Sequence, residues 1–371
     1  MTQLLAAEEQ FDNERGITMK GHDCIRFLTL AVSMASMTGL AHADTIRVLN
    51  WQGYGTDEDW SLEKFEAATG NTVEHEYFNS EQEMLTKLRT NPGTYDVVLI
   101  NSAYTQQAAE EGLIQPLDLT DFPHSEGLQA RLAHNPNLQY DGKLYGIAWL
   151  WGVTSFAINT GAFDEKPDSL MELWNPAHAG RLGWRDDAVE SCQFAALATG
   201  QDINDPSDYD VIRERLHALK PQIRTFWNSE NEWNQYMSSG EFDLATYWSG
   251  SAARSKQNFG LPIEFVVPRE GAIAWLDGLS IPTDAPHPEA AKQFIDWMID
   301  PEFYVQWDTE VGAPISANEK AVEQLPEGAF NKQLIAQLKE VKSLPFMGPM
   351  SDETREKMLE VWQETKTFYQ E

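Results

Sequence analysis

Aromatic side chains stand beside carboxylates at several predicted strand ends. Aromatic faces attract ammonium groups and pack on methylene chains, and carboxylates accept charge-assisted hydrogen bonds from amines. Taken singly, each residue could equally be a core Trp or a helix-capping Asp. Together they predict a site for an organic cation with several amines. The residues are Trp51 and Tyr54 in LNWQGY, Asp187 and Glu190 in DDAVE, Trp248 in LATYW, and Trp275 and Asp277 in WLDG.

The sequence has no P-loop, no dinucleotide-binding glycine pattern, no H-E-x-x-H and no G-x-S-x-G. The histidines show no metal-ligand spacing, and Cys192 has no nearby His. We therefore expect a protein that is not an enzyme, with no catalytic residue, cofactor or metal. A secreted hydrolase using the Asp187/Glu190 pair is an alternative. It is weaker, because nothing near the pair supplies a nucleophile or an oxyanion donor.

The 371 residues carry 58 acidic and 27 basic side chains, a formal net charge of −31. Such a charge repels nucleic acid and anionic membrane surfaces but is compatible with a cationic ligand. Most of it can be a hydrated surface. The length exceeds what one hydrophobic core usually supports, so two lobes are expected.

The N-terminal region has the layout of a secretory signal. Lys20 and Arg26 precede the apolar run 27–40, and Ala-His-Ala at 41–43 gives a cleavage pattern. We expect residues 1–43 to be an N-terminal extension and signal peptide, with translation starting at Met19 or at Met1. This predicts export to the periplasm, with no membrane span left after cleavage.

Strand and helix patterns alternate after the signal, as in an α/β protein whose ligand contacts lie at the carboxyl ends of its strands. Thr56 and Ser80 are predicted helix N-caps, and no flexible linker is evident, so the crossings between lobes should be short. The predicted strands are 46–50, 72–78, 95–100, 155–158, 243–248 and 263–267, and the predicted helices are 57–69, 81–90, 105–111, one after Asp186, 209–219, 288–299, 302–310 and 351–369.

The sequence resembles the bacterial periplasmic spermidine/putrescine-binding proteins, the receptors of polyamine ABC importers. The resemblance runs from about Ile46 to about Asn318 in LNWQGY, YDVVLINSAY, LWGVTSFAIN, DDAVESCQ, YWSGSA and EGAIAWLDGLSIP. It implies a two-lobe α/β fold with a hinged interlobe cleft, in which lobe 1 is 44–153 plus 276–322 and lobe 2 is 154–275 plus 323–371. It also implies a monomer that captures a polyamine and docks on permease subunits in the inner membrane.

The resemblance assigns a role to each candidate residue. It makes Trp51 and Tyr54 aromatic walls, Asp187 and Glu190 an acidic pair for amines, Trp248 and Trp275 flanks of the methylene chain, Asp277 an amine-binding carboxylate, and Asn101 and Ser102 polar lining residues.

The Gln52-Gly53 pair departs from the family pattern. Gln52 and Gly53 stand where the family usually has a hydroxyl residue and an acid, so Gln52 is a predicted lining residue and one carboxylate is missing. Which polyamine binds therefore stays open. An alternative ligand is an amine that also carries an anion, such as an amino acid derivative or an aminophosphonate, with Arg185 binding the anion.

Overall fold

The computed structural model describes residues 43–371. The predicted signal segment up to His42 lies outside these residues, so the export prediction is not tested. None of the helices within 43–371 is long and apolar enough to cross a membrane.

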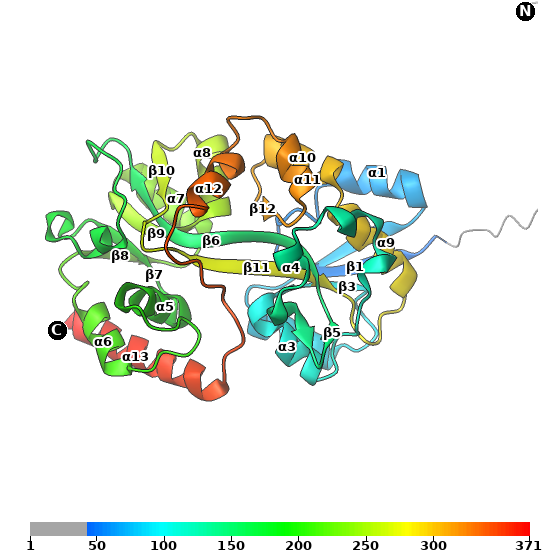
Figure 1. Ribbon diagram of the computed structural model, residues 1–371, viewed down its shortest axis with the longest axis horizontal. Coiled ribbons are helices and arrows are strands. Elements are labelled where there is room, and N and C mark those ends of the chain that lie inside the picture. Colours follow the sequence, from blue (N-terminus) through cyan, green and yellow to red (C-terminus); the bar gives the residue numbers. More distant parts are fainter. Residues whose placement is uncertain (1–42) are drawn as a thin grey trace, which may run out of the picture. The chain divides into compact units, whose positions relative to one another are not determined.

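Ten strands form one mixed sheet, in which β10 and β12 pair with β6 beside the main order β2-β1-β3-β11-β6-β9-β7-β8 (Figure 1). Strands β4 and β5 form a separate hairpin. The strands are β1 (Thr45–Asn50), β2 (Thr72–Tyr77), β3 (Val97–Asn101), β4 (Gln139–Tyr140), β5 (Lys143–Leu144), β6 (Ile147–Asn159), β7 (Leu182–Arg185), β8 (Ile223–Trp227), β9 (Leu244–Trp248), β10 (Ile263–Val266), β11 (Ile273–Ser280) and β12 (Ile315–Ser316).

The helices are α1 (Asp59–Thr69), α2 (Glu81–Thr90), α3 (Ser102–Glu110), α4 (Ala130–Ala133), α5 (Ala188–Thr199), α6 (Tyr209–His217), α7 (Glu230–Ser239), α8 (Ser249–Phe259), α9 (Pro288–Met298), α10 (Pro301–Glu310), α11 (Glu319–Gln324), α12 (Phe330–Leu338) and α13 (Asp352–Gln370). Helices alternate with strands from β1 to α3 and from β8 to β10, as the sequence pattern predicts, whereas most of the C-terminal part is helical.

The first βαβα unit matches its prediction except at two helix starts. Strand β1 pairs in parallel with β2 and β3, and Ser80 caps α2 by accepting from the Glu83 N–H. Thr56 does not cap α1, because its buried hydroxyl accepts from the Asn50 side chain instead. Helix α3 begins three residues earlier than predicted, because the Asn101 side chain caps it at Ala103.

The central strand β6 is far longer than the predicted strand 155–158. It spans 13 residues, of which all but the last are buried, and it pairs with β11 in its first part and with β9 and β10 in its second. Strands β6 and β11 run side by side through the middle of the sheet (Figure 1). The expected short crossings are therefore two long paired strands. The predicted lobe boundaries at 153/154 and 275/276 both fall within this pair, offset by two residues in its register, and stay a prediction.

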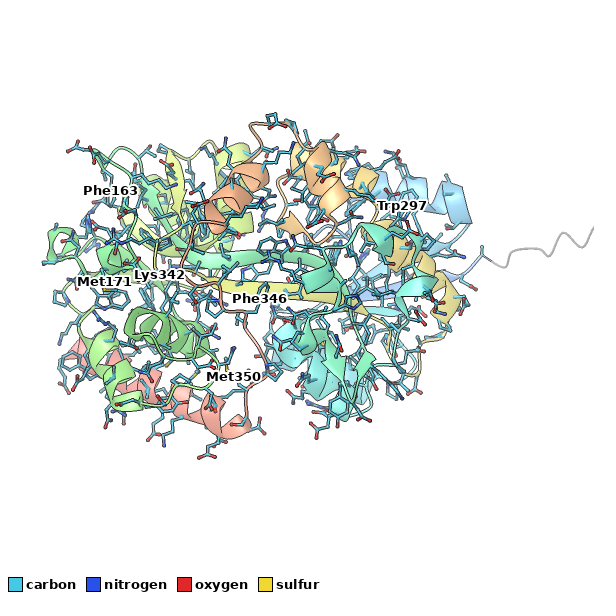
Figure 2. The ribbon with its side chains drawn as sticks, viewed as in Figure 1. Phe163, Met171, Trp297, Lys342, Phe346 and Met350 are labelled. Carbon is cyan, nitrogen blue, oxygen red and sulfur yellow. The ribbon has the colours of Figure 1, made fainter. Side chains whose placement is uncertain are left out.

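The segment before α13, around Phe346, contacts residues that are far apart in the sequence. Phe346, labelled in Figure 2, bridges to Ala274 of β11. The Met347 carbonyl accepts from Asn137, and Asn204 donates to the Phe346 carbonyl and accepts from the Gly348 N–H. This segment ties residues before β6 to residues after β7. Helix α13 then packs on α5 and α6.

Candidate functional site

Asp277 is the centre of a first polar group. It lies in the middle of β11 rather than at a strand end, directly opposite Asn101 of β3. Tyr54 Oη donates to Asp277 Oδ2 over 2.8 Å, and Asn101 Nδ2 donates to Asp277 Oδ1 over 2.9 Å. The side chain is 7 % exposed, and burial raises the pKa of Asp277 to about 6. A carboxylate accepts up to about four hydrogen bonds, so this one can still receive an amine.

Glu81 belongs to the same group, and the sequence analysis missed it. It is the first residue of α2, next to Asp277 and facing the Asn101 backbone N–H. Its Oε2 atom is buried and has no hydrogen-bond partner among residues 43–371. Burial, and then the charge of Asp277, raise the pKa of Glu81 to about 8. The alternation of predicted strands and helices over 46–100 was the available signal, because it indicates parallel strands, and residues that follow such strands gather at one edge of a sheet.

A second polar group forms where β7 and β9 end. Asp187 caps α5 by accepting from the Glu190 N–H over 2.8 Å. Glu190 Oε2 accepts from Trp248 Nε1 over 3.2 Å, while Oε1 is buried and without a partner among the described residues. Glu190 is only 5 % exposed, and burial raises its pKa. The structure thus brings three predicted site residues together at this end.

Arg185 also lies in this second group. Its Nη1 atom donates to Glu190 Oε2 over 2.8 Å, its Nη2 atom lies 3.6 Å from Asp187 Oδ2, and its guanidinium carbon lies 4.6 Å from the centre of the Trp248 ring. The neighbouring Asp186 instead binds Lys366. Arg185 therefore covers one aromatic face and neutralises part of the acidic pair.

Tyr104 and Arg355 lie between the two groups. Arg355 Nη1 donates to the Tyr104 hydroxyl over 2.8 Å, and its guanidinium carbon lies 4.4 Å from the ring centre. Tyr104 is close enough to the charges of Glu81 and Asp187 for both to raise its pKa, although burial is the larger cause. The two groups are therefore neighbours within one site. Neither Arg355 nor Tyr104 was among the predicted lining residues.

Three further predicted site residues, Ser102, Trp51 and Gln52, make contacts outside the two polar groups. Buried Ser102 donates to the Met347 carbonyl at 3.4 Å, so its hydroxyl faces the segment around Phe346 that precedes α13. Trp51 packs edge-on against Phe78, 4.6 Å between ring centres. Gln52 is exposed and makes no side-chain hydrogen bond within the described part of the chain. The contacts of Trp51 and Gln52 thus connect them to neither polar group.

Trp275 packs against the backbone of β6 at Gly152. A Cβ atom at Gly152 would lie 2.5 Å from Trp275 Cζ2 and 2.7 Å from Ser249 Oγ, and both distances are shorter than a non-bonded contact allows. We expect Gly152→Ala to lower the free energy of unfolding by about 1–3 kcal/mol through overpacking. Thermal denaturation measures this. Gly180→Ala is not a suitable control because of its positive φ, whereas Gly328→Ala has open space and should change stability little.

The fold is that of the two-lobe periplasmic binding proteins, which confirms the predicted fold class. The spermidine/putrescine ABC transporter substrate-binding protein of Streptococcus pneumoniae has a solved structure that superposes with a TM-score of 0.78 at 23 % identity. The match covers 88 % of this chain and 100 % of that one.

Residues 60–335 match the family described as bacterial extracellular solute-binding protein, and the chain belongs to this family. It is 34 % identical to the spermidine/putrescine-binding periplasmic protein of Escherichia coli, over 86 % of this chain and 91 % of that protein. It is 26 % identical to the putrescine/agmatine-binding protein of Pseudomonas aeruginosa, over 85 % and 94 % of the two chains. The family consists of binding proteins and is not an enzyme family. These matches confirm the resemblance seen in the sequence motifs.

Proposed function

We propose that this protein binds a polyamine such as spermidine or putrescine in the periplasm and delivers it to an ABC importer. The observation that carries the proposal is a pair of acidic groups, each with one buried carboxylate: Asp277 beside Glu81, and Glu190 beside Asp187. Tyr54 donates to the first group and Trp248 to the second. A linear polyamine presents ammonium groups at its ends and methylenes between them. Carboxylates bind the first and aromatic faces pack on the second.

Ligand entry requires the two lobes to separate. Asp277 and Glu190 are almost inaccessible in this structure, so an amine cannot reach either while the lobes hold this arrangement. The connections that would bend are β6, β11 and the crossing around Phe346. Lobe closure around the ligand would give the permease subunits one shape to recognise. The names of the relatives and the signal-like segment support the periplasmic location.

A second candidate ligand is an amine that also carries an anionic group. Arg185 favours it, because its guanidinium occupies the Trp248 face and pairs with Glu190, where a second ammonium would otherwise lie. Arg355 adds a further cation nearby that makes no ion pair within 4.0 Å among the described residues. Such a ligand would place its amine at Asp277 and its anion at Arg185.

Calorimetry and thermal-shift measurements separate the two candidates. We expect spermidine or putrescine to bind with a micromolar or lower Kd, because about 8 kcal/mol is within reach of a few charge-assisted and cation–π contacts. Stabilisation by zwitterionic amino acids or aminophosphonates alone would favour the second candidate. An absence of binding to all of these amines would overturn both.

A further inference from the structure

Glu81 is a carboxylate of the site that the family resemblance does not assign, and its Oε2 atom is buried. We propose that Glu81 binds the ligand directly and that, paired with Asp277, it holds one terminal ammonium of the bound amine. This inference rests on the proposed function and adds to it a residue and a proton-coupled binding step.

The position of Glu81 compensates for the carboxylate that the Gln52-Gly53 departure removes. Gly53 has no side chain to offer, and its backbone N–H donates to Asp57 instead. Glu81 reaches the same region from the neighbouring strand end, because α2 follows β2, which pairs with β1 in register. The first ammonium group therefore still meets two carboxylates.

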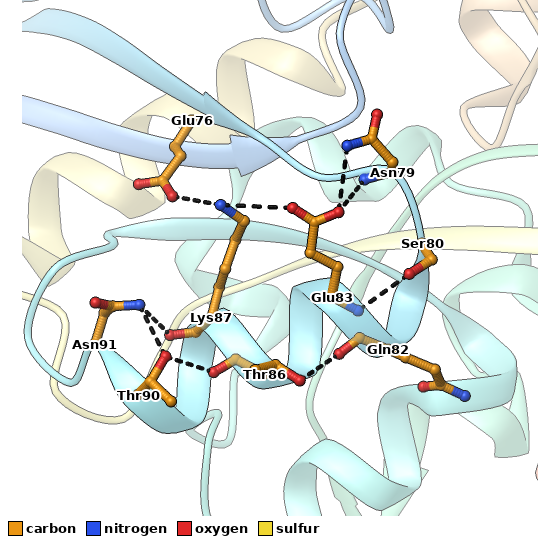
Figure 3. A network of polar contacts seen from close by, with 9 residues as sticks. All are labelled: Glu76, Asn79, Ser80, Gln82, Glu83, Thr86, Lys87, Thr90 and Asn91. Atoms are coloured by element: carbon orange, nitrogen blue, oxygen red, sulfur yellow. Dashed lines mark hydrogen bonds and ion pairs between the residues drawn. The ribbon is translucent and has the colours of Figure 1, made fainter.

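Helix α2 itself does not need the Glu81 side chain. Ser80 is the N-cap, and Glu83 accepts from the Asn79 backbone and side chain and lies 3.7 Å from Lys87 (Figure 3). Glu81, two residues earlier, takes no part in this outer network. Its Oε2 atom is buried without a partner among the described residues, so a donor from outside the chain would satisfy it.

The charged and titratable groups that face Glu81 come from four elements or turns. Asp277 on β11 repels its charge, Arg355 on α13 attracts it, and Tyr104 on α3 and Tyr54 after β1 are the other titratable neighbours. Arg355 makes no ion pair with Glu81 within 4.0 Å and donates to Tyr104. The nearest cation therefore leaves the carboxyl group open to a ligand.

Binding should release a proton from Glu81. Burial and the charge of Asp277 raise the pKa of Glu81 to about 8, so at pH 7 its carboxyl group is mostly neutral in the free protein. An ammonium group, whose own pKa is about 10, stabilises the ionised form and lowers that pKa. At pH 7, formation of the complex should then release about one proton. Affinity should rise with pH up to about 8 and fall as the pH drops below it.

The test is calorimetric titration with spermidine and with putrescine, at one pH in two buffers of different ionisation enthalpy. Wild-type protein should release about one proton at pH 7, and Glu81→Gln should release far less. Loss of a charge-assisted bond should weaken binding by about tenfold or more at pH 8.5 and by less at pH 6.5. Glu83→Gln is the matched control and should behave as the wild type, because it removes the same charge from the outer face of α2.

The outcomes are distinct. If Glu81→Gln keeps both the wild-type affinity and the wild-type proton release, this inference is overturned while the proposed function stands. A wild-type affinity that does not change between pH 6 and 8.5 overturns it as well, with no variant needed. Absence of amine binding by the wild type overturns the proposed function itself. Thermal unfolding of Glu81→Gln should match the wild type, because glutamine mimics the neutral carboxyl group.

Discussion

Asp277→Asn should weaken the binding of spermidine or putrescine by about ten- to a hundredfold at pH 7.5, as measured by calorimetry. The substitution keeps the shape and one acceptor oxygen for Tyr54 or Asn101 but removes the buried negative charge. An ammonium group enclosed by protein loses its water and depends on that charge. The variant should still fold, as far-ultraviolet circular dichroism can verify.

The pH dependence gives this prediction a second readout. Burial raises the pKa of Asp277 to about 6, so the carboxylate is ionised at pH 7.5 and becomes neutral as the pH falls through 6. Wild-type affinity should decline across that range, and the variant should lack this step. Asp308→Asn is a suitable control, because Asp308 is also buried with a pKa of about 6 but binds Asn331 and the Ala313 N–H. Equal losses in the two variants would contradict a specific role for Asp277.

Local rules predicted the elements that lie near the site in sequence. The parallel strands β1 and β3 bury apolar residues, and Trp248 ends β9 as the pattern indicates. The aromatic and acidic motifs identified side chains that the structure does gather into two groups. Aromatic and acidic residue types suited to binding a cation can be recognised from the sequence alone.

Long-range pairing accounts for what the sequence did not predict. WLDG looks like a break in an apolar run, yet Asp277 lies inside β11. Its oxygens accept hydrogen bonds from Asn101 of β3 and from Tyr54 in the turn after β1. Residues 147–159 form one strand because both faces of β6 are covered, which periodicity cannot distinguish from a shorter strand. The contacts of Arg185 with Glu190 and Trp248 likewise depend on how β7, α5 and β9 pack together, which the sequence does not show.

Arg185→Ala should have the largest effect in the opposite direction, raising the affinity for a dication by about tenfold or more. Removing the guanidinium exposes the Trp248 face and leaves the Glu190 and Asp187 carboxylates for a ligand amine. The free protein should lose about 1–3 kcal/mol of stability, because Glu190 is then buried with the Trp248 hydrogen bond but without its cationic partner. Added putrescine should therefore increase the Tm of this variant more than that of the wild type.

The sign of this effect separates the two candidate ligands. If the natural ligand is a polyamine, Arg185 limits its affinity and the variant binds it more tightly. If the ligand carries an anion, Arg185 binds that anion and the variant binds it at least about tenfold more weakly. Arg181→Ala is the control, since Arg181 pairs with Asp243 over 2.7 Å at the other end of β7 and should affect neither ligand. A polyamine affinity that falls in Arg185→Ala but not in Arg181→Ala would refute the placement of Arg185 at the position of a ligand ammonium.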